Sequence, residues 1–508
     1  MVNYNRAIHA FEKELPSRVI TRTEDLKKAM ENTLGVERKI HAILYPKTTK
    51  EVQKIVKIAN LYRTPLYPVS QGQNLGYGSK APIFDNQILV DLSLMNKIRE
   101  LNEVEGYVIV EPGVTQKQLY EFLKEVNASF IADVTGAPSN ASIIGNSLEG
   151  GFGHTPKGNR RKILADLEVI LGNGTLLKTG IFPNIGPDLS QLFVQSNFGI
   201  ITAMRISLLP KLEYFESFLI STEYEKFEEL IDGIRKLRQQ GTLTSLVHIG
   251  NAFRYLMTTG KVPSGFENKL LSAEESKKIL SNILGINFGD WVAIGALYGS
   301  RKEVGARKKE VKRNLGSKGQ LYFFNDQKLA QLERGSFFMK MWGKNTAHFV
   351  TGYKILHNLM QGIPTDDPLQ NALWRIEKRE ELGLLWLSPT TTASGVKVKT
   401  IVQIAEPLFQ KYQFEMPLTI TLVEPERVVG VLNITFNKNN EEQKNRAHQL
   451  YHELSQNLKQ QGIFPYRESI MGMQKIVYGD PGKKEVLRML KKTLDPHNII
   501  SPGRYGIS

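Results

Sequence analysis

The sequence predicts an α+β protein with two domains. Its 508 residues can form two hydrophobic cores, and its content of 41% hydrophobic and 23% charged residues is typical of globular proteins. Short apolar strands, amphipathic helices and glycine-rich loops alternate up to about residue 212. Glycine-rich loops become rare in 213–461, and a loop-rich character returns in 462–508. We therefore expect one domain built from 1–212 and 462–508, and a second α+β domain at 213–461.

The elements can be assigned in order from the spacing of the apolar residues. Residues 41–46 have the pattern of a strand, and Thr48 begins a helix whose apolar face runs from Val52 to Ala59. The next strand ends at Pro68, just before a glycine-rich loop. Further strands are expected at 88–92, 107–111, 167–171, 175–178 and 198–203, and helices at 116–126, 225–239 and 441–461.

The loop at 68–78, with the sequence PVSQGQNLGYG, is the most informative stretch. Gly72, Gly76 and Gly78 let backbone N–H groups turn towards one point and let a ligand approach closely, which suits a pyrophosphate. An ordinary turn uses the same residues, so the loop alone leaves both interpretations open. It lacks the G-x-G-x-x-G spacing and the later acidic residue of a Rossmann dinucleotide site.

Composition excludes several classes of function. The chain has no cysteine, which excludes disulfides, thiolate zinc sites and a cysteine nucleophile. The net charge is +15, but the basic residues are dispersed, and the densest run at 301–312 reads as a solvated helix face. We find no nucleic-acid-binding motif. His448 and His452 have a metal-compatible spacing without an H-E-x-x-H motif, so we expect a solvated helix face and no metal.

Four further blocks follow the glycine loop. They are VEPGVT at 110–115, IIGN with GFGHTP between 143 and 156, SNFGI at 196–200, and SPGR at 501–504. With the loop at 68–78, their content and order resemble the FAD-binding domain of the vanillyl-alcohol oxidase / p-cresol methylhydroxylase (PCMH) family. The resemblance implies a two-subdomain PCMH-type FAD-binding domain and an α+β cap domain that holds the substrate. The cap region, 213–461, matches the family more loosely.

The resemblance also implies where FAD lies. The loop at 70–78 would wrap the pyrophosphate, the loop at 135–146 would follow the phosphates and the isoalloxazine, and the backbone at 198–201 would meet the adenine side. Arg504 falls where the family places a cation near the flavin N1/O2 edge, a charge that stabilises reduced flavin. The implied FAD contacts are Pro68, Ser70, Gln71, Gly72, Gln73, Asn74, Leu75, Gly76, Tyr77, Gly78, Pro112, Thr135, Gly136, Ser142, Ile143, Gly145, Asn146, Gly151, Gly153, His154, Gly199, Ile200, Ile201 and Arg504.

Family substrates are typically para-substituted phenols, which are bound as phenolates by two tyrosines and one arginine. Tyr77, Tyr466 and Arg467 match these three residues. Lone-pair donation from the phenolate oxygen helps a hydride to leave the benzylic carbon, so stabilising charge at that oxygen is catalytic. A structural tyrosine hydroxyl and a surface arginine are the alternative interpretation of Tyr466 and Arg467.

Two departures from the family pattern stand out. The family's Asp-Val-Pro-Asp stretch, whose second acid lies beside flavin N5, reads here as Asp133 to Gly136, and that second acid is missing. A carboxylate there would tune the flavin or deprotonate an alcohol. The segment at 382–389, where many relatives tether FAD, offers no His or Tyr. We therefore expect non-covalent FAD with a lower oxidising power than that of covalent relatives.

His154 lies in the GFGHTP block, close to the expected flavin. It is a candidate catalytic residue, as a proton acceptor, a substrate hydrogen-bond partner or an unusual flavin tether. Relatives often carry Tyr at this position, which favours a polar residue that lines the site.

The favoured function is an FAD-dependent oxidoreductase that takes a hydride from a carbon next to a phenolic ring. It would pass the electrons to O2 or a redox protein. The first alternative keeps the flavin but has a non-phenolic alcohol, a 2-hydroxy acid or a biosynthetic intermediate as substrate. The second is a basic binding protein on a degenerate flavin scaffold, against which the intact loop glycines argue. The N-terminus has no apolar signal core and no stretch nears ~20 apolar residues, so we expect a cytoplasmic protein without a membrane span, which could form a homodimer.

Overall fold

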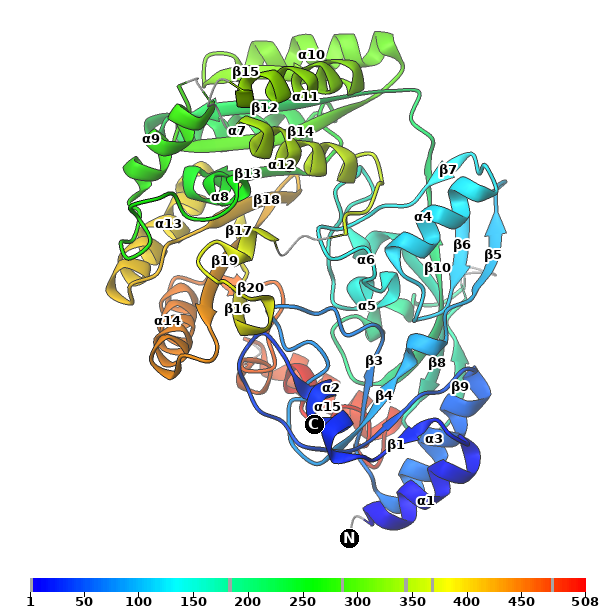
Figure 1. Ribbon diagram of the computed structural model, residues 1–508. Coiled ribbons are helices and arrows are strands. Elements are labelled where there is room, and N and C mark those ends of the chain that lie inside the picture. Colours follow the sequence, from blue (N-terminus) through cyan, green and yellow to red (C-terminus); the bar gives the residue numbers. More distant parts are fainter. Residues whose placement is uncertain (1–2, 181–184, 285–286, 342–345, 367–369, 477–478) are drawn as a thin grey trace.

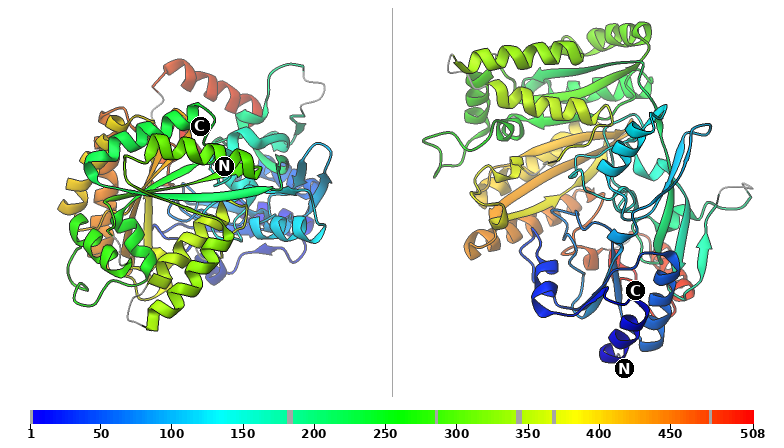
Figure 2. Two further views of the ribbon diagram at one scale, coloured as in Figure 1. Left: turned by 90° about the horizontal axis from the view of Figure 1, so that it is seen from above. Right: turned by 45° about the vertical axis from the view of Figure 1, so that its right-hand side comes forward.

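The computed structural model describes residues 3–180, 185–284, 287–341, 346–366, 370–476 and 479–508. The fold is α+β, as predicted (Figure 1). The two ends of the chain lie together in the lower body of Figure 1, and the middle of the chain forms the upper body, an arrangement that the turned views in Figure 2 also show. Within these described residues, no helix is both long and apolar enough to cross a membrane.

A four-stranded sheet forms the first half of the lower body, in the order β1-β2-β4-β3. Strands β2, β4 and β3 run parallel, and β1 pairs with β2 antiparallel. Thr48 starts the crossover helix α3 as expected, because its hydroxyl accepts a hydrogen bond from the Glu51 N–H. The elements are β1 Val19–Ile20, β2 Ile40–Leu44, β3 Leu66–Val69 and β4 Gln87–Asp91, with helices α1 Tyr4–Glu14, α2 Thr23–Met30 and α3 Thr49–Tyr62.

A five-stranded antiparallel sheet forms the second half, in the order β5-β6-β10-β8-β9. Its own core contains buried side chains of β6, β8, β10 and α4. A short pair, β7 with β11, lies beside it. The elements are β5 Ile98–Asn102, β6 Tyr107–Val110, β7 Phe130–Ile131, β8 Leu164–Leu171, β9 Leu176–Lys178, β10 Gly199–Ser207 and β11 Leu209–Pro210, with helices α4 Gln116–Glu125, α5 Ile143–Leu148, α6 Arg160–Ile163 and α15 Pro481–Leu494.

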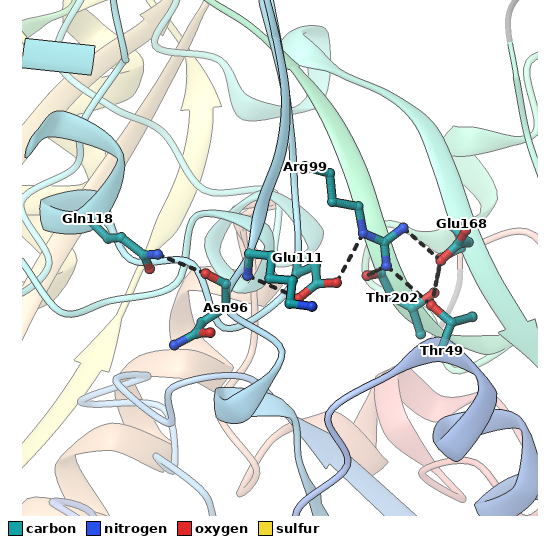
Figure 3. Close-up of polar contacts among 8 residues, drawn as sticks. Thr49, Asn96, Arg99, Glu111, Gln118, Glu168 and Thr202 are labelled. Atoms are coloured by element: carbon teal, nitrogen blue, oxygen red, sulfur yellow. Dashed lines mark hydrogen bonds and ion pairs between the residues drawn. The ribbon is translucent and has the colours of Figure 1, made fainter. Parts of the chain in front are cut away.

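The two halves share apolar and polar contacts. Buried residues of α3 pack with Ile170 and Ile200 of the second sheet. Beside them, Arg99 donates to Glu111 at 3.0 Å and to Glu168 at 3.1 Å, and Thr49 at the start of α3 donates to Glu168 at 2.6 Å (Figure 3). This network ties the first turn of α3 in one half to the strands of the other half.

The upper body is built on one antiparallel sheet with nine strands among the described residues. Eight of them follow the order β15-β12-β14-β13-β18-β19-β17-β20, and β16 also pairs with β19. The strands are β12 Tyr214–Thr222, β13 Val247–Asn251, β14 Trp291–Gly299, β15 Gln320–Phe324, β16 Leu382–Leu387, β17 Pro389–Thr392, β18 Leu418–Glu424, β19 Arg427–Asn437 and β20 Phe464–Pro465.

Alternate residues of this sheet face two different cores. One face packs against helices α7, α10, α13 and α14, and the other face packs in part against α8, α9 and α12. The rest of the second face is turned towards the lower body. The helices are α7 Phe227–Gln239, α8 Ala252–Leu256, α9 Ala273–Leu284, α10 Arg301–Leu315, α11 Asp326–Met341, α12 Thr346–Leu359, α13 Gly395–Lys411 and α14 Glu441–Gln460.

The C-terminal segment returns from the upper to the lower body. β20 closes the edge of the upper sheet by pairing with β17, and Tyr466 and Arg467 follow at once. Further on, Ile500 forms a bridge to Leu66 at the free edge of β3, and the Ser501 N–H donates to the Leu66 carbonyl at 2.8 Å. Arg504 is thereby carried to the base of the glycine loop.

The expected elements are confirmed. The helices predicted at 116–126, 225–239 and 441–461 are α4, α7 and α14, with ends within two residues of the prediction. The strands predicted at 88–92, 107–111, 167–171, 175–178 and 198–203 correspond to β4, β6, β8, β9 and β10.

Candidate active site

A cleft of about 1240 Å³, its open mouth included, lies where the glycine loop, α5, β10 and the C-terminal segment meet. The glycine loop contributes residues 70–74, and the upper sheet contributes Trp386. Arg467 and Arg504 also line it. The cleft therefore joins segments that are up to about 430 residues apart in the sequence.

The glycine loop presents its backbone to this cleft. Gly72 and Gly76 have φ angles of +69° and +73°, which L side chains rarely adopt. The N–H groups of 71–75 make no hydrogen bond to any other described residue. Successive free N–H groups on a glycine-rich turn form a concavity that binds anions. This loop can therefore hold a phosphate group.

Polar groups of α5 lie on the opposite wall. The Ser142 hydroxyl accepts from the Gly145 N–H and donates to the Pro112 carbonyl at 2.6 Å, which anchors the start of the helix. One turn on, the Asn146 side-chain carbonyl is buried and has no hydrogen-bond partner among the described residues. A buried polar atom without a partner is costly, so a ligand in the cleft would offset that cost.

A buried cluster of charge forms the base of the cleft. Arg504 pairs with Glu149 and donates to the Tyr67 hydroxyl at 3.0 Å, and Tyr505 donates to the other Glu149 oxygen. Burial alone would raise the pKa of Glu149, but Arg504 and Arg467 lower it overall, so the carboxylate is ionised. Two arginines and one carboxylate leave one positive charge in excess, which suits an anionic ligand.

Tyr77, Tyr466 and Arg467, predicted from opposite ends of the chain, are brought together. The Arg467 guanidinium lies 3.7 Å from the centre of the Tyr77 ring and 6.0 Å from that of Tyr466. Arg467 donates to the Asn74 side chain, and its Nε is buried without a partner among the described residues. Burial and the neighbouring Tyr466 raise the pKa of Tyr77 well above its ordinary value. Tyr77 is therefore a neutral hydrogen-bond donor beside an arginine that has capacity for an anion.

The upper sheet completes this cluster from above. The Tyr77 hydroxyl is 2.5 Å from the Ser388 hydroxyl, and Trp386 packs edge-on against the Tyr77 ring at 5.6 Å. Trp386 and Ser388 are two residues apart and face the same side of the sheet. Both belong to the segment at 382–389, which therefore lies against the site, although it carries no His or Tyr.

The stretch around the missing acid has a different neighbour. A side chain at Gly136 would meet the Cε1 atom of His154 at 3.4 Å. His154 in turn stacks on His248 of β13, with ring centres 4.5 Å apart. Burial lowers the pKa of His154, so the ring is neutral near pH 7. Asp133, the acid that remains, is buried against Arg160 at 3.1 Å.

The sequence-predicted FAD contacts divide into two groups. Lining the cleft are Pro68, Ser70, Gln71, Gly72, Gln73, Asn74, Pro112, Ser142, Gly145, Asn146, Gly199, Ile200, Ile201 and Arg504. Outside its lining are Leu75, Gly76, Tyr77, Gly78, Thr135, Gly136, Ile143, Gly151, Gly153 and His154. Within the second group, Gly76 lies against Trp386, Gly136 lies against His154, and Ile143 is buried in the core of the five-stranded sheet.

Sequence reasoning missed several residues of the site. Glu149 and Trp386 line the cleft, Ser388 contacts Tyr77, and His248 contacts His154. Glu149 lies between the IIGN and GFGHTP motifs, so its place in the sequence was a usable signal. His248 lies on an ordinary apolar strand, and nothing in its sequence context distinguishes it.

Two segments match known families. Residues 40–180 match the FAD binding domain family, and residues 429–505 match the C-terminal domain of FAD linked oxidases. A solved structure of p-cresol methylhydroxylase with substrate bound is 26% identical, superposes with a TM-score of 0.87, and covers 100% of this chain and 98% of that one. The chain therefore carries both domains of the FAD linked oxidases, and over its whole length it is similar to a PCMH-type flavoprotein.

The relatives of this chain differ in their reactions. The chain is 28% identical to the 4-cresol dehydrogenase [hydroxylating] flavoprotein subunit of Pseudomonas putida, over 99% of this chain and 96% of that protein. It is 29% identical to the 1'-carboxy-chondrochloren decarboxylase of Chondromyces crocatus, over 98% and 97%. A shorter match, 33% identical over 40% of this chain and 38% of the relative, is to the mitochondrial D-2-hydroxyglutarate dehydrogenase of Bos taurus.

The cleft suits the cofactor of a PCMH-type FAD-linked oxidase. The free N–H groups of the loop fit a pyrophosphate, and the Asn146 side-chain carbonyl, which has no partner among the described residues, can accept a hydrogen bond from a ligand. The excess positive charge at the base of the cleft fits the electron-rich edge of a reduced flavin ring. The protein is thus an FAD-dependent enzyme of the oxidase/dehydrogenase type.

Proposed function

We propose that the enzyme oxidises a para-substituted phenol by taking a hydride from the carbon attached to the ring. The substrate would be bound as a phenolate by Tyr77, Tyr466 and Arg467. The observation that carries this proposal is the buried Arg467, which has an unpartnered Nε and lies 3.7 Å from one phenol ring. A buried guanidinium gains most from an anionic partner, and a phenolate is the anion that the two tyrosine hydroxyls can also solvate.

The three residues would act on the charge of the substrate oxygen. Ser388 holds the Tyr77 hydroxyl at 2.5 Å and so limits its motion. The cation lowers the pKa of a phenol that binds beside it, and the substrate enters its reactive ionised form. The oxygen lone pair then stabilises the electron-poor carbon that remains when the hydride leaves. These donors need no rearrangement during the reaction, which is the source of their catalytic effect.

FAD, when bound, would supply the two-electron acceptor for the hydride. We propose that the loop at 70–78 binds the pyrophosphate, that 142–146 lies along the flavin and its phosphates, and that 199–201 meets the adenine. Arg504 would lie at the N1/O2 edge, with Glu149 limiting its net charge. We also propose that FAD is held without a covalent bond.

The missing acid changes which residues would surround the reacting carbon. We propose that His154 lines the site next to Gly136 and offers a ring nitrogen there, while Asp133 acts structurally through Arg160. We further propose that 1–212 with 462–508 forms the FAD-binding domain and 213–461 the cap, with the two-residue strand β20 as the C-terminal segment's contribution to the cap sheet.

An anaerobic substrate screen tests the proposal. Holoenzyme is mixed with 4-ethylphenol, 4-propylphenol, a benzylic alcohol without a phenol, and D-2-hydroxyglutarate, and bleaching of the flavin band is followed. Reduction by the alkylphenols and by neither of the other two supports it. Rapid reduction by the hydroxy acid alone would overturn it and favour the non-phenolic alternative.

The partners can be tested on the same preparation. We propose O2 or a redox protein as the electron acceptor and a homodimer as an accessible assembly. Mixing the reduced enzyme with air-saturated buffer tests O2 as the acceptor, because the absorbance of oxidised flavin returns within one turnover in an oxidase. Light scattering tests for the homodimer.

A further inference from the structure

The face of the upper sheet that looks towards the FAD cleft carries a row of four side chains, three of them polar. Thr390 is paired with Val429, Val429 with Thr421, and Thr421 with His248, so the four lie side by side across four strands. Thr390 is two residues from Ser388, which holds Tyr77. Neighbouring strands are about 4.8 Å apart, so His248 lies roughly 14 Å from Thr390. The row therefore leads from the phenolate end of the site to His248.

His248 offers a buried donor at the far end of this row. Its Nδ1 is 3.0 Å from the Thr421 hydroxyl, and its side chain is 6% exposed. Its Nε2 is buried and has no partner among the described residues. When Thr421 donates to Nδ1, the neutral ring carries its proton on Nε2. His154 stacks on this ring from the Gly136 side and keeps it beside the reacting centre.

Arg254 adds a positive charge to this end. It follows β13 on helix α8, and its charge is felt at His248, whose pKa it lowers after the larger effects of burial, His154 and Arg238. Among the described residues, the Arg254 guanidinium forms no hydrogen bond and no ion pair. The nearby Arg238 differs, because it donates to the Ser245 carbonyl and lies in the field of Glu426 and Glu424. Arg254 is partly buried, and a partly desolvated guanidinium without a carboxylate beside it gains from an anionic partner.

We propose that the substrate carries a carboxylate at the end of its para side chain and that His248 and Arg254 bind it. The inference rests on the proposed phenol oxidation and specifies its substrate class, a para-hydroxyphenyl alkanoic acid or a longer acid of that type. Arg467 holds the phenolate oxygen, His154 borders the reacting carbon, and His248 with Arg254 holds the carboxylate. Arg467 at one end and Arg254 at the other thus match a substrate with two anionic ends.

Binding measurements test this specificity apart from turnover. Calorimetry on the holoenzyme compares ω-(4-hydroxyphenyl)alkanoates of three to five chain carbons with 4-alkylphenols of the same length. We expect at least one acid to bind about tenfold more tightly than its matched alkylphenol, the effect of a charged hydrogen bond. The ratio of the affinity for the acid to that for the alkylphenol should fall towards one in Arg254→Gln, and Arg254→Lys should keep part of the preference. His248→Gln should also lower the ratio. Arg6→Gln, an exposed arginine on α1, is the matched control and should keep the ratio.

The outcomes separate this inference from the proposed function. Equal or weaker binding of every acid overturns the carboxylate site, even when alkylphenols reduce the flavin. A preference that survives both Arg254→Gln and His248→Gln also overturns it. If both variants remove the preference for the acids, the carboxylate site is supported. If, in addition, no phenol bleaches the flavin of the wild-type enzyme, the oxidation proposal fails and the carboxylate site stands.

Discussion

Arg467 and Tyr77 come from opposite ends of the chain, and the Arg467 guanidinium lies 3.7 Å from the centre of the Tyr77 ring. Tyr77 is placed by the glycine loop, and Arg467 follows β20 at the edge of the upper sheet. Ser388, between β16 and β17, holds the Tyr77 hydroxyl. This cluster therefore forms only when both bodies have folded and docked.

Removing the arginine should separate catalysis from cofactor binding. In Arg467→Ala, flavin reduction by 4-alkylphenols should slow by about 100-fold or more, the usual loss when one donor to a developing oxyanion is removed. FAD should stay bound, because the loop at 70–78 and Arg504 remain. Stopped-flow absorbance measures the rate, and the spectrum of the purified protein measures the FAD content. Arg467→Lys should lose less than Arg467→Ala, and unchanged kinetics in both variants would remove Arg467 from the substrate site.

The two stacked histidines should make stability depend on pH. Burial lowers the folded-state pKa of His154 and His248 below 6.5, the ordinary value of histidine, and Arg238 and Arg254 lower that of His248 further. Below pH 6.5 the unfolded chain then binds more protons than the folded chain, so the free energy of unfolding falls as the pH falls. Each group contributes up to about 1.4 kcal/mol per pH unit between its folded pKa and 6.5.

Denaturant unfolding between pH 7.5 and 5.5 measures this slope. Replacement of His248 by Gln should flatten it, because Gln does not titrate. His9→Gln is the control, since His9 lies on the exposed side of α1. A slope that His248→Gln leaves as steep as in the wild type contradicts the assignment.

The Asp133–Arg160 pair should matter for stability more than for specificity. Both side chains are almost fully buried, and Asp133 also accepts hydrogen bonds from the N–H and hydroxyl of Thr155. Asp133→Asn leaves the Arg160 charge without its counter-ion, which costs about 3–5 kcal/mol in buried pairs. Calorimetric unfolding should show this loss. The surface pair of Asp25 with Arg22 is the control, and Asp25→Asn should cost far less stability than Asp133→Asn, because water already solvates both charges.

Acid precipitation should release all of the flavin. Among the described residues that line the cleft, Tyr67 is the only His or Tyr, and burial raises the pKa of its hydroxyl, which already binds Arg504. A protonated, hydrogen-bonded phenol is a poor nucleophile towards a flavin. After precipitation and centrifugation, absorbance of the supernatant should account for the whole cofactor. A yellow pellet would show a covalent link, and peptide mapping would identify the residue.

The fold and the cluster of Tyr77, Tyr466 and Arg467 were accessible from the sequence because their signals are local. Periodicity indicated the helices and strands, Tyr77 stands in the glycine-rich loop, and Tyr466 and Arg467 match the family as an adjacent pair. Glu149 and Trp386 were missed as partners, because their roles depend on what packs opposite them. His248 illustrates the limit most clearly. Only the pairing of β13 with β18, and the docking of the lower body against it, brings this residue to His154.

Gly76 has a φ of +73° and lies close to the Trp386 ring, and the effects of these two features can be measured separately. A Cβ there would lie 2.7 Å from the Trp386 ring, so Gly76→Ala should displace the ring that packs on Tyr77. Gly241 has nearly the same φ, +72°, and a Cβ there would meet nothing within 4 Å. Gly241→Ala thus carries the backbone strain alone, about 1–2 kcal/mol, and should leave FAD binding normal.

Fluorescence titration of both apo-variants with FAD measures the difference. Gly76→Ala should bind FAD more weakly than Gly241→Ala, because Trp386 lines the cleft and its displacement changes the wall against which the cofactor rests. Adding Trp386→Leu to Gly76→Ala should restore part of the affinity, since a smaller side chain leaves room for the new methyl group. If both single variants bind FAD equally well, the contact of Gly76 with Trp386 does not contribute to cofactor binding.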